Sequence, residues 1–113
     1  MTDRELLELS AKAAGYIVLR YVNDYADEYG KAPDYGLQIE GYYCIWNPLE
    51  DDGDAFRLAV KLRINVTHGA NMVNAEREQP EEVAAVEPFN GDPAAATRRA
   101  IVKAAAEIGR RMP

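Results

Sequence analysis

The chain has few of the residues that build covalent or metal-based sites. Its 113 residues include one cysteine, Cys44, and one histidine, His68. A single cysteine excludes a disulfide within one chain and a cysteine-based metal cluster. The sequence also lacks a glycine-rich phosphate loop, a Gly-x-Ser-x-Gly nucleophile turn and a His-Glu zinc motif. We therefore expect no cofactor and no metal site.

Long hydrophobic runs are also absent from the sequence. No stretch approaches the roughly 20 apolar residues of a membrane-spanning helix. Glu5 and Glu8 stand where a signal peptide would be apolar. Hydrophobic residues make up 48% and charged residues 28% of the chain, a balance typical of a globular fold. These observations predict one cytoplasmic domain over residues 1–113 and no association with a membrane.

Charge is unevenly distributed around a formal net value of −6. Residues 24–54 are strongly acidic, with Lys31 as their one base, whereas the segment 98–113 is basic. An acidic chain as a whole binds nucleic acid poorly. Its basic end nevertheless keeps nucleic-acid binding as an alternative function. Basic residues also suit the C-terminal end of a helix, where they complement the helix dipole. The candidate nucleic-acid-binding residues are Arg98, Arg99, Lys103, Arg110 and Arg111.

The seven tyrosines all lie between residues 16 and 43, overlapping the acidic segment. Tyrosine combines a large contact area with a polar tip and is enriched at protein interfaces. We therefore predict a non-catalytic protein-binding surface here, for an unknown protein partner or a second copy in a homodimer. Its candidate residues are Tyr25, Tyr29, Tyr35, Asp27, Glu28 and Asp34.

The acidic run 50–54 offers two further interpretations. It fails as a calcium loop, because the twelfth position counted from Glu50 is Lys61 rather than a bidentate Glu. Asp51 or Asp52 suits the N-cap of a following helix. A small hydrolase that uses His68 with Asp51, Asp52 or Asp54 stays an alternative, which requires these side chains to converge.

Hydrophobic periodicity predicts three helices and several strands. The helices are expected at 3–14, at 52–62, where Phe56 and Val60 flank the buried stripe, and from Asp92 to a closing Gly109. In the last helix the expected buried stripe is Ala94, Thr97, Ile101, Ala104 and Ile108. The strands are expected at 16–22, 37–40, 42–46, 64–68, 72–76 and 83–89. The segments 37–40 and 42–46 form either one strand bulged at Gly41 or two strands around a tight bend. For 16–29 a helix is the alternative, because Tyr21, Tyr25 and Tyr29 are spaced four apart. The fold class that follows is α+β: a single three-layer α/β/α-type domain with three helices packed on a mostly antiparallel sheet.

Two segments resemble a family of small proteins encoded by tailed bacteriophages and prophages. Residues 46–62, WNPLEDDGDAFRLAVKL, are similar to its W-x-P-S/L-T-D-D-x-x-A-L-x-L-V-x-K-L segment, and residues 92–106, DPAAATRRAIVKAAA, to its P-x-A-I-C-R-A-A-L-x-A helix. The N-terminal helix ending at Ala14-Gly15 also fits. The family is the phage ABA-sandwich family.

This resemblance implies a three-layer fold of helices and strands and a phage or prophage accessory protein in the bacterial cytoplasm. It assigns no activity and no site residues. The chain departs from the family pattern over residues 21–36, which look like an insertion, and an insertion is where an individual function would lie.

Overall fold

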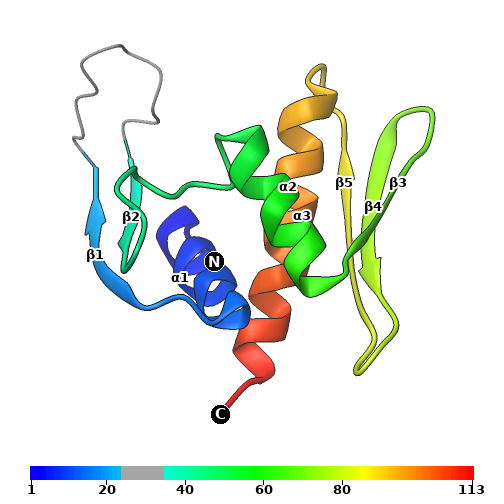
Figure 1. The fold of residues 1–113 in the computed structure, drawn as a ribbon. Coiled ribbons are helices and arrows are strands. Elements are labelled where there is room, and N and C mark those ends of the chain that lie inside the picture. The colour runs from blue at the N-terminus through cyan, green and yellow to red at the C-terminus, as the bar shows by residue number, and fades with distance from the viewer. Residues whose placement is uncertain (24–34) are drawn as a thin grey trace.

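Three helices lie between two antiparallel sheets in the computed structural model, which describes residues 1–23 and 35–113 (Figure 1). The helices are α1 (Asp3–Ala14), α2 (Asp52–Leu62) and α3 (Pro93–Arg111). The strands are β1 (Val18–Val22), β2 (Gly36–Ile39), β3 (Asn65–His68), β4 (Met72–Arg77) and β5 (Val83–Pro88). The expected α+β class, its three helices and the antiparallel pairing are confirmed, and the strands divide into the sheets β1-β2 and β3-β4-β5.

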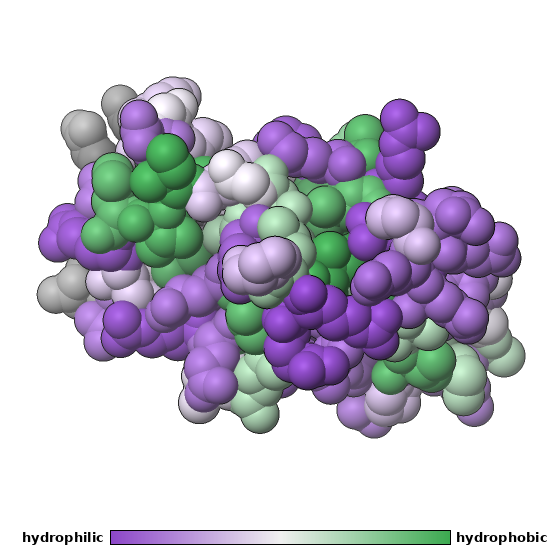
Figure 2. Space-filling view, turned by 90° about the horizontal axis from the view of Figure 1, so that it is seen from below, coloured by the Kyte–Doolittle hydropathy of each residue, from purple (hydrophilic) through white to green (hydrophobic). Residues whose placement is uncertain are grey.

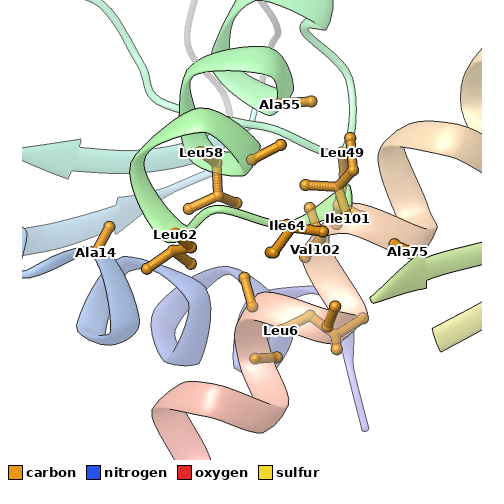
Figure 3. Close-up of a cluster of buried hydrophobic side chains, with 14 of the residues drawn as sticks. Leu6, Ala14, Leu49, Ala55, Leu58, Leu62, Ile64, Ala75, Ile101 and Val102 are labelled. Carbon is orange, nitrogen blue, oxygen red and sulfur yellow. The ribbon is translucent and has the colours of Figure 1, made fainter. Parts of the chain in front are cut away.

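Helix α3 is the centre of the molecule, with α1 and α2 on one side and the three-stranded sheet on the other (Figure 1). Its alanines allow close approach of these neighbours, so most of its length is buried. Figure 3 shows the resulting core, which includes Leu58 and Leu62 of α2 and Ile101 and Val102 of α3. The expected stripe of α3 is buried at Ile101 and beyond, but Ala94 is exposed, because it lies in the first turn at the end of the helix layer.

Gly109 does not end α3, contrary to the expectation from sequence, since the helix continues to Arg111. A Cβ at Gly109 would overlap the carbonyl oxygen of Leu9 and lie 2.9 Å from its carbonyl carbon. The glycine therefore permits the backbones of α1 and α3 to touch, a packing role that local helix signals do not distinguish from a cap.

The other helix ends carry local caps. Thr2 accepts a hydrogen bond from the amide of Glu5 in α1, and Gly15 takes the left-handed conformation after it, at φ 80°. Asp51, rather than Asp52, caps α2 by accepting from the Asp54 amide at 2.8 Å. Asp92 does the same for α3 through the amide of Ala95.

The β1-β2 sheet confirms a strand at the start of the segment 16–29, for which a helix was the alternative. Val22 pairs with Gly36, so the two ends of the segment between them are held side by side. The expected strand at 42–46 is wrong: the chain turns at Gly41, which has φ 84°, and only Trp46 pairs again, in one bridge to Leu37. A Cβ at Gly36 would lie 2.6 Å from the Trp46 carbonyl oxygen, so this bridge needs the glycine.

The second sheet has the order β3-β4-β5, so β3 and β5 are its edges. Pro88 lies in β5, where it is tolerated because an edge strand leaves one row of backbone groups without a strand partner. Val73 and Ala75 of the central strand are fully buried against α3. At the other edge, β3 lies beside the end of α2 from which the chain enters it (Figure 1).

Candidate functional site

Of the predicted tyrosine-rich surface, the structure describes one residue, Tyr35. Its hydroxyl donates to Glu50 at 3.0 Å, and its carbonyl accepts from the Asn47 side chain at 2.8 Å. Burial, followed by the hydrogen bond to Glu50, raises the pKa of Tyr35 from 10.0 to about 12. Tyr35 thus anchors the loop before α2 rather than standing free. The other five predicted residues, Tyr25, Tyr29, Asp27, Glu28 and Asp34, lie outside the described residues.

The five basic residues predicted to meet nucleic acid each pair with an acidic side chain of the same chain. The pairs are Arg98 with Asp52, Arg99 with Asp3, Lys103 with Glu87, Arg110 with Glu107, and Arg111 with both Glu107 and Glu81. These residues project from α3 toward several different neighbours rather than forming one cationic face. Their charges are offset within the fold, which favours a structural role.

Arg98 shows this role most clearly, because its side chain is only 16% exposed. It donates to the carbonyl oxygen of Leu49 at 2.8 Å and to the carboxylate of Asp52 at 2.7 Å. Both partners lie at the start of α2. Arg98 therefore connects α3 to the N-terminal end of α2.

The structure does not bring His68 to the carboxylates proposed for a hydrolase. Its Nε2 lies 2.8 Å from the Thr97 hydroxyl, and its ring faces Phe89 with 6.2 Å between ring centres. In the described part of the chain, Asp51 caps α2, Asp52 pairs with Arg98 and Asp54 is buried beneath Tyr42. No catalytic pairing of His68 with these groups is formed.

Asp54 is instead the centre of a structural network. Its side chain is 2% exposed and accepts hydrogen bonds from the Tyr42 hydroxyl, the backbone N–H of Asn47 and the Arg57 guanidinium. Burial and the neighbouring Asp54 carboxylate raise the pKa of Tyr42 to about 12. The network fixes the irregular segment 42–47 onto α2.

An apolar depression lies where α2, α3 and β3 meet, and we call it the α2–β3 groove. Its volume is about 710 Å³. It is lined by Asp52, Ala55, Phe56, Ala59, Val60, Arg63, Ile64, Asn65, Val66, Ala94, Thr97, Arg98 and Ile101. Phe56 and Val60 are 68% and 60% exposed. The groove is therefore mainly apolar and open to a partner.

The groove borders β3, which is an edge strand of its sheet in the described part of the chain. The amide of Gly69 donates to the carbonyl of Met72 at 2.8 Å and closes the β3–β4 hairpin. Hydrogen-bonded and non-hydrogen-bonded pairs alternate along an antiparallel ladder. Val66 opposite Ala75 and His68 opposite Val73 are therefore non-hydrogen-bonded pairs, whose strand-β3 N–H and C=O groups point away from β4. These groups face the open side of the sheet.

Arg63 stands at the rim of the groove in an unusual conformation. It ends α2 with φ 57° and ψ 42°, the left-handed region that favours glycine. Among the described lysines and arginines, it alone has no hydrogen bond, ion pair or aromatic contact from its side chain. The groove thus has one cation whose charge is not offset by the fold.

A second apolar surface lies at the β1-β2 end of the molecule, where Figure 2 shows hydrophobic side chains gathered. Ile17 and Leu19 are both exposed there. Neither side chain lines the α2–β3 groove. The groove is the candidate site developed below, because it combines exposed apolar side chains with a depression and a strand edge.

Sequence reasoning missed the groove, although part of its signal was present. Phe56 and Val60 are four residues apart and flank the buried stripe of α2, a spacing that places them on one helix face. Nothing in the sequence showed that this face borders the free edge of a strand. The combination depends on tertiary packing.

In the described part of the chain, no helix is long and apolar enough to span a membrane, and no group of three His, Cys, Asp or Glu side chains is placed to hold a metal. No protein-family model matches the sequence, and no similar curated protein or solved structure was found.

Proposed function

We propose that the protein is a non-catalytic protein-binding module that receives a partner in the α2–β3 groove. The observation that carries this proposal is the exposure of Phe56 and Val60 beside an apolar depression and an unpaired strand edge. Aromatic residues in recessed apolar surfaces are frequent anchors of protein interfaces. Burial of a side chain such as Phe56 by a partner contributes about 1.5–3 kcal/mol.

The resemblance to the phage ABA-sandwich family supports a proposed role as a phage or prophage accessory protein in the host cytoplasm. The residues of the resemblance have structural positions: Trp46, Leu58 and Leu62 are buried, and Asp51 caps α2. Such residues specify a fold and leave the surface free to vary. Location of the gene among phage structural or regulatory genes would support this proposal, and location in an operon of unrelated bacterial metabolism would oppose it.

A capture experiment tests the binding proposal with a matched pair of variants. The immobilised protein is exposed to bacterial lysate, and captured proteins are quantified by mass spectrometry. Val60→Lys places a charge in the groove, whereas Val86→Lys places one on an equally exposed valine of β5 (60% against 56% exposed). We expect a partner held by the wild type and by Val86→Lys, with retention reduced at least tenfold, about 1.4 kcal/mol, by Val60→Lys.

The binding is then repeated with the purified partner to show that contact is direct. We expect circular dichroism to show the wild-type melting temperature for both variants, since neither valine is buried. A partner lost equally from both variants, or from neither, would contradict binding through the α2–β3 groove.

A further inference from the structure

We propose that the occupant of the α2–β3 groove is an extended, acidic peptide segment of the partner, which pairs with β3 as an added strand and directs a carboxylate to Arg63. This inference rests on the proposed function and specifies its ligand. It is carried by the backbone of β3, by the shape of the groove and by its charge.

The backbone of β3 favours an extended ligand over a helical one. The N–H and C=O groups of Val66 and His68 point away from β4 and are not used by the hairpin. A helix satisfies its own backbone groups and cannot pair with them, whereas an added strand forms main-chain hydrogen bonds along the edge. The edge strand therefore matches an extended segment.

The side chains of the groove match the period of a strand. Alternate residues of an added strand point to the same face, and on the helix-facing side they would meet the groove between α2 and α3. Ala55, Ala59 and Ala94 leave space there, while Phe56 and Val60 form an apolar wall. We therefore expect apolar side chains at every second position of the ligand.

The charge of the groove identifies the ligand as acidic. Its charged residues are Asp52, Arg98 and Arg63, of which the first two form an ion pair at 2.7 Å. Arg63 leaves the groove with an excess positive charge in a protein whose formal net charge is −6. The same net charge disfavours a second copy of the chain as the occupant, because like-charged copies repel.

Arg63 also occupies a position where glycine would be the easier residue. The left-handed backbone costs an arginine more than it costs a glycine, so a purely structural helix end has no need of this side chain. Arg63→Gly therefore removes the guanidinium while the backbone conformation becomes easier to adopt. A loss of binding in this variant is not attributable to misfolding.

The test is selection from a displayed library of random linear peptides, carried out with the wild type, Arg63→Gly, Val60→Lys and Val86→Lys. We expect the wild type and Val86→Lys to enrich peptides with apolar residues at alternate positions and an Asp or Glu at a fixed offset. Arg63→Gly should lose the acidic preference and bind a selected peptide at least tenfold more weakly. Val60→Lys should lose enrichment.

Amide hydrogen exchange with one selected synthetic peptide then tests the strand pairing. Added-strand binding should slow exchange at the amides of Val66 and His68, while amides on the outer surface of β5 stay unchanged. Peptides enriched with helical spacing, or binding without protection at these two amides, would overturn the inference and leave the proposed groove intact. If no peptide enrichment depends on Val60, both the strand-pairing inference and the proposed α2–β3 groove are overturned.

If Arg63→Gly keeps the wild-type affinity and the wild-type preference for acidic peptides, Arg63 does not bind a carboxylate of the ligand, even if strand pairing is observed. Enrichment of basic peptides would have the same effect. A stable dimer of the free protein that is abolished by Val60→Lys would show that a second copy occupies the groove instead.

Discussion

At Arg63, glycine would stabilise the fold, whereas the proposed function needs the arginine side chain. Its backbone is left-handed, and its side chain has no partner among the described residues. We expect Arg63→Gly to raise the free energy of unfolding by about 1 kcal/mol, because glycine adopts this conformation without the Cβ penalty. Urea denaturation measures the change. Destabilisation would show that the guanidinium supports the fold, and would weaken its assignment to a ligand.

Two aspartates in the first turn of α2 provide a contrast in burial at the same scale. Asp54 is 2% exposed and satisfies three donors, whereas Asp52 is 80% exposed and makes one ion pair. We expect Asp54→Ala to lower the free energy of unfolding by about 2–3 kcal/mol, since it leaves the buried Asn47 amide without an acceptor. Asp52→Ala should lower it by less than about 1 kcal/mol. Equal effects in thermal melts would contradict the network.

At the scale of elements, alanine substitutions at two helical glycines, Gly109 and Gly53, should have opposite effects on stability. A Cβ at Gly109 would strike the backbone of Leu9, whereas a Cβ at Gly53 would lie 3.1 Å from the flexible end of Arg57. We expect Gly109→Ala to destabilise the protein by about 1–3 kcal/mol through separation of α1 and α3. Gly53→Ala should be neutral or stabilising by up to about 0.5 kcal/mol, because alanine favours a helix. Chemical denaturation of both variants measures the difference.

The C-terminal end of α3 gives a pH prediction. The hydrogen bond from Arg110, supported by that from Arg111, lowers the pKa of Glu107 from 4.5 to about 2. A carboxyl group whose pKa is lower in the folded state stabilises that state above its unfolded pKa, and the contribution is lost as pH falls through the folded pKa. The stability difference between wild type and Glu107→Gln should thus be constant above about pH 5.5 and disappear between about pH 4.5 and 2. A difference that grows on acidification would contradict this linkage.

Local signals in the sequence predicted the elements well and their contacts less well. Asp51 caps α2 and Asp92 stands at the start of α3 as expected, because a capping bond depends on residues within three positions. Trp46 was expected in a strand, but it makes only one bridge, to Leu37. The position of Trp46 depends on its carbonyl lying against Gly36, ten residues earlier in the chain, and local signals do not predict such a contact. The groove was not predicted for the same reason. It arises where Phe56 and Val60 meet a strand that follows them in the chain.

At the scale of the whole molecule, the basic residues near the C-terminal end of the sequence form ion pairs with acidic residues of the same chain. The basic end of the chain does not form an independent cationic surface, because α3 is central and each of its five candidate residues reaches an acidic neighbour. Pairing of this kind lowers the local positive potential available to an external phosphate. This argument favours a protein partner over nucleic acid.

The paired cations of α3 lead to a prediction that separates protein binding from nucleic-acid binding. We expect the wild type to leave a short DNA duplex unshifted in a gel assay at low salt, since its net charge is −6 and its α3 cations are paired. Glu107→Gln removes the shared partner of Arg110 and Arg111, so any DNA retention should be stronger in this variant and should fall steeply with added salt. Wild-type binding that is reduced by Arg110→Ala and Arg111→Ala would show instead that these ion pairs open for phosphate. In that case α3, rather than the α2–β3 groove, would be the first surface to examine for function.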